Sequence, residues 1–280
     1  MIRRWLMACG LVLALAALPA HAQDVRWDAL LPGLDVTLWN PGERCYGEVS
    51  GLYVLRADPE RIRFAVYHYR DEHLGEPLAA PAWLERTEAS VIVNAGLFRE
   101  DYSYLGLLLK DGRSLGSRRH ATWRGLFVAE PTAAGLPKAR VLDLMEDRFD
   151  EKRPAYTEAA QSLMLVDRSK KLRVRPSGKQ AHQTIVAEDT AGHILIMKTT
   201  EEVGLRVLAE CVRNAYPSLR LAMAMDGGSS SDVVMSKTLW PRRSVERDEI
   251  PRAPAWLPLI EGQRGGHDPL PAVIGLFPRQ

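Results

Sequence analysis

The sequence predicts a mixed α+β fold in a single domain, with mostly antiparallel sheets and a few packed helices. Many short segments have strand patterns, few have a helical pattern, and the two do not alternate as they do in a doubly wound parallel sheet. The 280 residues are 46% hydrophobic and 26% charged, a composition that can bury a core and that excludes a disordered chain. We therefore expect one globular domain with sheets at its centre.

The first half of the chain begins with two strand patterns and a short helix. Residues 51–56 and 62–69 are separated by a turn at 58–59, and the second segment alternates with the period of two that a half-buried strand shows. Pro81 favours the first turn of a short helix that continues to Arg86, because proline lacks only an amide hydrogen that has no partner there.

Further short strands follow in the middle of the chain. Val91–Val93 is apolar throughout, which predicts a buried strand that ends at the turn 94–96. Residues 105–109 precede Asp111-Gly112, a dipeptide typical of hairpin turns. Similar apolar segments predict strands at 125–128, 162–166 and 194–198.

The clearest helical pattern covers residues 201–216, where apolar residues recur on one face. Thr199 and Glu202 have the spacing of a capping box at its start. Residues 219–225 then predict a central strand. The segment after Trp240 is rich in proline and arginine, and we expect it to cover the surface.

The N-terminus has the pattern of a secretory signal. Arg3 and Arg4 precede the apolar segment Leu6–Leu18, which is followed by an Ala-x-Ala ending at Ala22. This predicts a signal peptide over residues 1–22 and a periplasmic or secreted mature domain over 23–280. The apolar segment is shorter than the roughly 20 residues that span a bilayer, and we expect no integral membrane segment after cleavage.

Charge argues against a nucleic-acid partner. The chain has 37 Lys and Arg against 35 Asp and Glu. Two of the arginines lie in the predicted signal, so the mature balance is 37 − 2 = 35 against 35. Nucleic-acid-binding domains usually show a basic excess, which is missing here.

Two cysteines, Cys45 and Cys211, remain in the predicted mature chain. An exported compartment permits a disulfide between them. Cys211 also falls on the apolar face of the predicted helix, where a free cysteine behaves as a small hydrophobic residue. Both interpretations stay open on the sequence.

Two turns are candidates for chemistry, at residues 91–98 and 222–231. Each leads a buried strand directly into a polar residue and glycine, which lets the backbone approach a ligand closely. Asp226, in Asp-Gly-Gly-Ser-Ser-Ser, could serve as an acid, a base or a metal ligand. It could equally cap the turn that follows it. Nucleophile-elbow, zinc-protease, Walker and dinucleotide signatures are absent.

The order of these segments resembles the phosphodiester glycosidase family over about residues 50–240. The family's Asn-Gly/Ala-Gly-x-Phe turn is matched by residues 94–98, and its glycine and Asp-Gly turn by Gly106 and residues 111–112. Its Gln-Ser strand start is matched by residues 161–162, and its Asp-Gly-Gly-Gly-Ser-Ser/Thr loop by residues 226–231.

The resemblance implies an exported hydrolase that cleaves a sugar-1-phosphodiester at the anomeric carbon in envelope or extracellular glycans. It implies catalytic roles for Asp226 and Asn94, and a carbohydrate or sugar-phosphate substrate held by neighbouring residues. Those substrate-binding candidates are Gly96, Phe98, Gln161, Gln183, Thr184, Gly227, Gly228, Ser230 and Ser231. Asn94 and Asp226 should then share one cleft. No cofactor is expected, although a divalent metal at Asp226 is not excluded.

The chain departs from the family pattern at several positions. Gln183 stands where the family has an arginine, and Ser229 stands where it has a third glycine. An arginine there would bind phosphate in a bidentate manner, which glutamine cannot do. The arginines that could substitute are Arg99, Arg118, Arg119 and Arg124.

Glycoside chemistry usually needs a second carboxylate. Its unranked candidates are Glu100, Asp101, Glu188, Asp189 and Asp232. Two other functions remain as alternatives, a non-catalytic glycan-binding module on the same fold and a metal-dependent phosphodiesterase.

Overall fold

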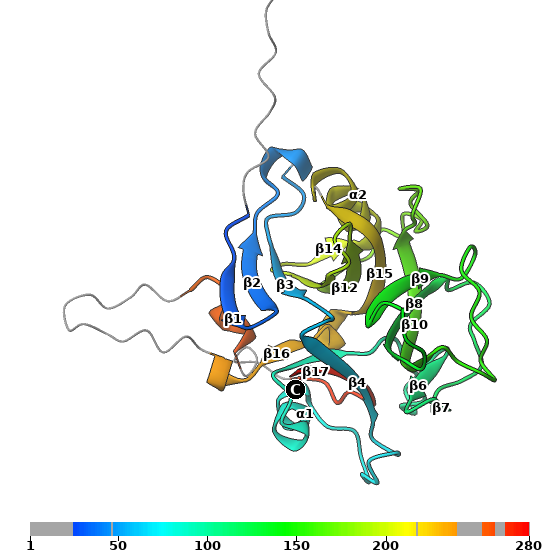
Figure 1. The fold of residues 1–280 in the computed structure, drawn as a ribbon. Helices are drawn as coiled ribbons and strands as arrows, with labels where there is room; N and C mark the ends of the chain where they lie inside the picture. Colours follow the sequence, from blue (N-terminus) through cyan, green and yellow to red (C-terminus); the bar gives the residue numbers. More distant parts are fainter. Residues whose placement is uncertain (1–24, 46, 217, 240–253, 261–266, 280) are drawn as a thin grey trace, which may run out of the picture.

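The computed structural model describes residues 25–45, 47–216, 218–239, 254–260 and 267–279, and its two main sheets pack against each other (Figure 1). The larger sheet contains, in spatial order, β1 (Asp28–Leu31), β2 (Leu34–Trp39), β3 (Leu52–Ala57), β13 (Ile194–Thr199), β12 (Gln183–Asp189), β15 (Leu219–Gly227), β10 (Tyr156–Val166), β6 (Leu108–Lys110) and β7 (Arg113–Ser114). It is extended by β8 (Gly125–Pro131), which pairs with β10, and β9 (Ala139–Asp143), which pairs with β8.

The smaller sheet has the spatial order β16 (Val233–Met235), β5 (Val91–Asn94), β17 (Ala272–Pro278) and β4 (Ile62–His68). A short third pair joins β11 (Gln180–Ala181) and β14 (Val203–Gly204). The described helices are α1 (Ala80–Thr87), α2 (Leu205–Ala215) and the short 3-10 helices η1 (Gly42–Cys45), η2 (Gly228–Ser230), η3 (Lys237–Leu239) and η4 (Leu257–Leu259).

The elements form layers, with α2 outside the larger sheet and α1 outside the smaller one. The main core lies between the sheets, where Phe64 of β4 meets Phe127 of β8 edge to face. A second core packs α2 on the outer face of the larger sheet, and a third packs Trp83 of α1 on the smaller sheet. Both faces of each sheet are therefore covered by apolar contacts over much of their area.

The expected antiparallel sheets are confirmed, because every pairing between described strands is antiparallel apart from one isolated bridge. The fold is mainly β rather than a balanced α+β. Strand 62–69 is found as β4, the strand at 219–225 as β15, and Pro81 lies in the first turn of α1. β6 begins only at Leu108, since Gly106, at a φ of 97°, interrupts the predicted strand 105–109.

The predicted capping box is wrong. The helix begins at Leu205, with Gly204 as an N-cap that makes no side-chain cap bond. Thr199 is instead the last residue of β13, and its hydroxyl accepts a hydrogen bond from the Gln183 amide at 3.0 Å. Residues 203–204 form β14, so strand pairing overrides the local capping signal here.

The expectation that the whole tail covers the surface is also wrong. Residues 272–278 form β17, which lies between β5 and β4 at the centre of the smaller sheet. Residues 240–253 and 261–266 lie outside the described residues, as does the predicted signal at 1–22. Among the described residues, no helix is both long and apolar enough to cross a membrane.

Cys45 and Cys211 form a disulfide, with their Cα atoms 5.0 Å apart. The bond joins η1 to α2, and both cysteines belong to the core beneath α2. Cys211 is thus a buried residue of the helix's apolar face, but it is bonded rather than free, so the disulfide interpretation holds and the free-cysteine interpretation is wrong.

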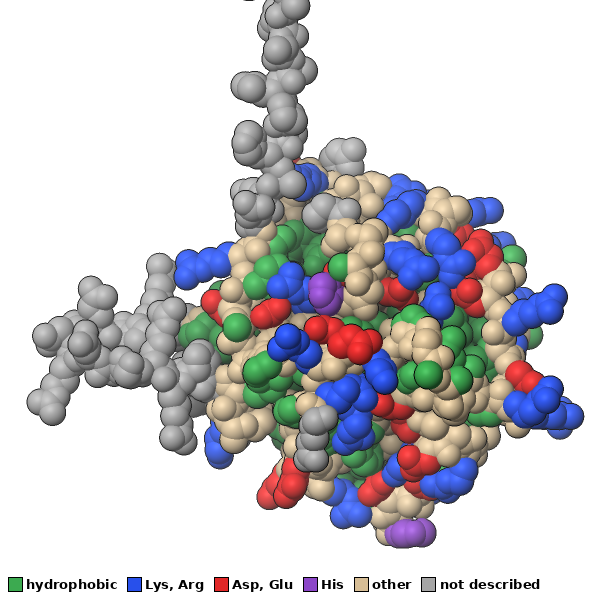
Figure 2. Space-filling model, viewed as in Figure 1, with side chains coloured by type: hydrophobic (Ala, Val, Ile, Leu, Met, Phe, Trp, Pro, Cys, Tyr) green, Lys and Arg blue, Asp and Glu red, His purple; other side chains and the backbone are tan. Residues whose placement is uncertain are grey.

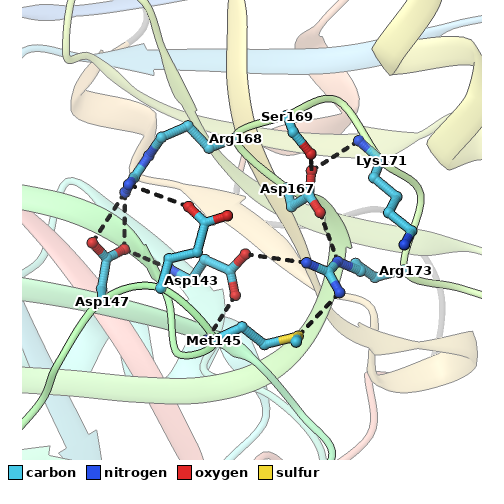
Figure 3. A network of polar contacts seen from close by, with 9 residues as sticks. Asp143, Met145, Asp147, Asp167, Arg168, Ser169, Lys171 and Arg173 are labelled. Atoms are coloured by element: carbon cyan, nitrogen blue, oxygen red, sulfur yellow. Dashed lines mark hydrogen bonds and ion pairs between the residues drawn. The ribbon is translucent and has the colours of Figure 1, made fainter.

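A polar network ties the ends of β9 and β10 together, away from the candidate site (Figure 3). Buried Asp167 accepts hydrogen bonds from Ser169 and Arg173, each at 2.7 Å. Burial opposes ionisation, but the hydrogen bonds outweigh it and lower the pKa of Asp167. The same turn contacts the Leu219 carbonyl through Lys170. The network therefore fixes the beginning of β15, and Asp226 lies near the other end of that strand.

Candidate active site

The candidate site forms where the chain passes from the larger sheet to the smaller one. β15 carries Asp226 at its end, η2 and Ser231–Asp232 make a tight crossing, and β16 then pairs with β5. β5 ends at Asn94. The short crossing therefore brings the Asp226 loop against Asn94, although 226 − 94 = 132 positions separate them in the sequence.

Asp226 is half-buried and accepts several hydrogen bonds. Ser230 Oγ donates to its Oδ2 at 2.7 Å, and the Gly227 amide donates to its Oδ1 at 2.8 Å. Burial raises the pKa of Asp226, the hydrogen bonds from Ser230, Gly227 and Asn94 oppose the rise, and the charge of Asp268 adds to it. The net result is a carboxyl group that holds its proton to a higher pH than an exposed aspartate, as an acid catalyst requires.

Asn94 holds the two turns together. Its side chain is fully buried, its Nδ2 donates to the Ser230 carbonyl at 2.8 Å, and its Oδ1 accepts from the Gly96 amide at 2.8 Å. Gly96 is required beside it, because a Cβ at that position would lie 2.7 Å from the Tyr104 hydroxyl and φ is 139°. Phe98, on the same turn, stacks on Tyr102 with ring centroids 6.1 Å apart.

The hydroxyl groups beside the loop are paired with one another. Thr184 Oγ1 and Ser231 Oγ lie 2.7 Å apart, and both residues are buried. This places Thr184 of β12 on the same side of the sheet as the loop. Together with Ser230 they form a hydroxyl-lined wall next to Asp226.

The two glycine amides do not serve as the predicted phosphate cradle. The Gly227 amide donates to Asp226, and the Gly228 amide donates to the His182 carbonyl at 2.8 Å. Both groups are already used inside the protein. Gly227 instead allows close packing, since a Cβ there would lie 2.8 Å from Gln183 Oε1.

Gln161 has its whole hydrogen-bonding capacity engaged by the backbone. Its Oε1 accepts from the amides of Leu107 and His120, at 3.0 and 2.8 Å. Its Nε2 donates to the carbonyls of His120 and Trp123, at 3.0 and 2.7 Å. A glutamine amide offers two acceptor and two donor positions, so none remains for the substrate that we expected Gln161 to bind. Gln161 fixes the segment 117–124 beside the site.

We predict that Gln161→Leu destabilises the fold by about 2–4 kcal/mol, because it leaves buried backbone groups of that segment without partners. Urea unfolding measures the change. Gln180→Leu is the matched control, since Gln180 is exposed and its variant should stay within about 0.5 kcal/mol of wild type. Equal midpoints for both variants would contradict the structural role of Gln161.

Gln183 lies on the other side of β12 from the loop hydroxyls. Its Nε2 donates to the Val203 carbonyl at 3.3 Å, and its side chain packs against Gly227. Arg99 and Arg119, two of the arginines proposed to replace the missing guanidinium, are engaged elsewhere. Arg99 binds Ser103, and Arg119 pairs with Glu151 at 2.7 Å.

Three residues that sequence reasoning missed approach the loop. His267 Nδ1 lies 3.0 Å from Asp232 Oδ2, Lys198 Nζ lies 3.7 Å from Asp232 Oδ1, and Ser229 Oγ donates to Asp268. His267 and Asp268 lie just before β17, and Lys198 lies on β13. An isolated His-Asp pair ahead of an apolar segment was the only signal in the sequence, and it is a weak one.

The structure also shows which candidates for the second carboxylate lie near Asp226 and which lie far from it. Glu188 and Asp189 lie at the far end of β12, opposite Leu221 and Leu219, and Glu188 is paired with Arg220. Glu100 is exposed, and Asp101 caps the Ser103 turn. Asp232 and Asp268 are the carboxylates found beside the Asp226 loop. Within the described ranges, no three His, Cys, Asp or Glu residues are grouped to hold a metal.

A polar hollow of about 450 Å³ adjoins Tyr104, whose buried hydroxyl donates to the carbonyls of Ala95 and Gln161. His68, Arg70 and Ser117 contribute to its lining. Its size falls in the range of small-ligand sites.

On the face shown in Figure 2, acidic and basic side chains are interspersed, and the green hydrophobic side chains appear between them.

The fold and the site define a β-rich domain with a half-buried carboxyl group of raised pKa where two sheets meet. A sequence model of the family described as phosphodiester glycosidase matches residues 87–255, more than half of the chain. The protein belongs to this family. A comparison with curated proteins finds no match.

Two solved structures share the fold. A hypothetical protein from Synechocystis matches with a TM-score of 0.60 and 11% identity over 94% of this chain, which spans 64% of that protein. The zebrafish N-acetylglucosamine-1-phosphodiester alpha-N-acetylglucosaminidase catalytic domain, auto-inhibited by its pro-peptide, matches with a TM-score of 0.58 and 12% identity. That match covers 89% of this chain and 85% of the zebrafish chain.

Proposed function

We propose that the protein is an exported hydrolase that cleaves sugar-1-phosphodiesters at the bond between the anomeric carbon and the phosphate oxygen. The observation that supports this most is Asp226, a half-buried carboxyl group with a raised pKa in a loop that matches the family's motif. Membership of the phosphodiester glycosidase family supports the class of substrate.

In the proposed reaction, one carboxyl group donates a proton to the leaving group and a second takes a proton from the attacking water. Asp226 is half-buried and its pKa is raised, so it donates a proton to the departing phosphate oxygen. Asp268 is exposed and takes a proton from the water that attacks the anomeric carbon. The carbon–oxygen bond to water forms as the bond to phosphate breaks, giving a free sugar and a phosphomonoester.

The remaining residues position the substrate and the acid. Asn94 holds the loop through the Ser230 carbonyl, and Ser230 orients the Asp226 carboxyl through Oδ2. Thr184 and Ser231 are buried, and the hydrogen bond between their hydroxyl groups holds the loop against β12. No step in this mechanism needs a metal ion.

Export is part of the proposal. It is supported by the predicted signal over residues 1–22 and by the Cys45–Cys211 disulfide, a bond that persists in oxidising compartments such as the periplasm. The intact mass of the protein recovered from outside the cytoplasm tests it. A chain that begins at Gln23 is the expected result, and a recovered chain that still carries Met1 would contradict it.

Hydrolysis in ¹⁸O-labelled water tests the reaction, with a panel of sugar-1-phosphodiesters as substrates. Cleavage at the anomeric carbon puts the label in the sugar hydroxyl, and chelator should leave the rate unchanged. Label in the phosphate together with chelator sensitivity would favour a metal-dependent phosphodiesterase. Glycan binding without turnover would favour the non-catalytic module, an alternative supported by the departures at Gln183 and Ser229.

A further inference from the structure

Lys198 presents a cation on the same side of the larger sheet as the Asp226 loop. It is the cross-strand partner of Thr184, and directly opposed residues of neighbouring strands point to the same face. Thr184 touches Ser231, and Lys198 Nζ lies 3.7 Å from Asp232 Oδ1. The strand register and the contact with Asp232 thus both place the ammonium group beside the loop.

The spacing of the strands fits a sugar phosphate. β12 lies between β13, which carries Lys198, and β15, which carries Asp226. Neighbouring strands are about 4.8 Å apart, so these two backbones are separated by about 10 Å. A sugar above Asp226 and Asp268 would place its anomeric phosphate on the Lys198 side.

Asp232 keeps Lys198 charged in a shielded position. The Lys198 side chain is only 15% exposed, and burial lowers its pKa while the Asp232 carboxylate opposes that shift. The other oxygen of Asp232 is bound by His267 Nδ1 at 3.0 Å. The Asp232 carboxylate is therefore shared between Lys198 and His267, one oxygen for each.

The ammonium group also has free hydrogen-bonding capacity. Lysine offers three N–H donors, and the 3.7 Å contact with Asp232 is longer than a hydrogen bond. In the part of the chain that the structure describes, Asp232 is the ion-pair partner of Lys198. Gln183 carries no charge and points toward Val203. Lys198 is consequently a cation positioned to meet an anion at this loop.

We propose that Lys198 binds the phosphate group of the substrate and thereby sets a preference for phosphate-linked sugars over neutral glycosides. This inference rests on the proposed function for the identity of the substrate. The anion approaches Nζ from its exposed side, while Asp232 pairs with the lysine through one carboxylate oxygen and contacts His267 through the other. The sugar then lies toward Asp226.

Lys198→Gln tests the charge, because glutamine removes the positive charge but keeps a polar side chain, and Asp232 keeps its contact with His267. Losing a charged hydrogen bond to phosphate corresponds to about a tenfold to hundredfold loss in binding. We expect a rise of that size in the dissociation constant of glucose 1-phosphate, measured by calorimetry, and in KM for the diester. Lys198→Arg should recover much of both.

The matched control is Lys152→Gln, which removes one positive charge from an exposed loop position. It should leave the binding of glucose 1-phosphate and the turnover at wild-type values. Thermal unfolding of each variant shows whether the fold is kept. A Lys198→Gln protein that binds glucose 1-phosphate as wild type does would overturn the proposal.

The two proposals fail in different ways. If the wild-type protein binds glucose 1-phosphate through Lys198 but hydrolyses no diester, the phosphate site is supported and the proposed reaction is contradicted. If the wild-type protein hydrolyses diesters and Lys198→Gln leaves KM unchanged, the proposed reaction is supported and the phosphate site is contradicted. A neutral aryl glycoside serves as a control substrate, because its KM should be the same in Lys198→Gln as in wild type.

Discussion

Asp226→Asn should lower the turnover of a sugar-1-phosphodiester by at least about 100-fold while the fold stays intact. Asparagine keeps the shape of the side chain, and its Oδ1 can still accept from the Gly227 amide. It carries no transferable proton. A steady-state assay at saturating substrate measures the change, because proton transfer affects kcat rather than substrate binding.

The same variant should be at least as stable as wild type at neutral pH. The pKa of Asp226 is raised in the folded protein, so the folded state binds this proton more tightly than the unfolded state does. The stabilisation from the protonated group is complete below the unfolded pKa of about 3.9, and it is lost as pH rises through the higher folded pKa. Asparagine does not ionise, so the free energy of unfolding of the variant does not fall as pH rises through that range.

Ser230→Ala provides the matched control for that interpretation. It removes the hydroxyl that donates to Asp226 Oδ2 but leaves the carboxyl group in place. Activity should fall less than in Asp226→Asn. If Asp226 only caps the turn, asparagine would cap it almost as well. Near-wild-type turnover in Asp226→Asn would then contradict the catalytic role.

Much of the fold could be predicted because strand patterns are local. The alternation over 62–69 and the apolar segment 219–225 give β4 and β15 within two residues at each end. Asn94 and Asp226 were identified for the same reason, as polar residues at the ends of buried strands. Their contact could be expected from the family resemblance but not from periodicity alone.

The failures come from long-range pairing. β17 pairs with β4 and β5, more than 170 positions earlier, and nothing in the proline-rich tail signals this partnership. Because β17 was missed, His267 and Asp268 just before it were missed as well. Lys198 approaches the loop only through the register that sets it opposite Thr184.

Local signals also mislead when tertiary contacts compete with them. Thr199 and Glu202 have the correct capping spacing, yet Thr199 is paired with Leu52 of β3 and binds the Gln183 amide. Gln161 matched a family motif and suggested a substrate contact, whereas its amide is saturated by backbone partners. Such roles depend on which backbone groups would otherwise remain unpaired.

The disulfide is the second feature whose removal should have a large effect. Cys45 and Cys211 are 166 positions apart, and closing a loop of that length stabilises a fold by up to about 5 kcal/mol in the chain-entropy model. Alanine at both positions avoids burying hydroxyl groups, since each cysteine is 3% exposed. Guanidinium unfolding of Cys45→Ala/Cys211→Ala should show a loss approaching that value.

Activity of the folded double variant should be close to that of wild type. The disulfide joins η1 to α2 on the outer face of the larger sheet, whereas Asp226 lies in the crossing to the smaller sheet. Wild-type protein treated with reductant should unfold at the same denaturant concentration as the double variant, because both lack the cross-link. If the double variant instead unfolds at the midpoint of oxidised wild type, the bond contributes nothing to stability. The stability of this layer would then come from the apolar contacts of α2 alone.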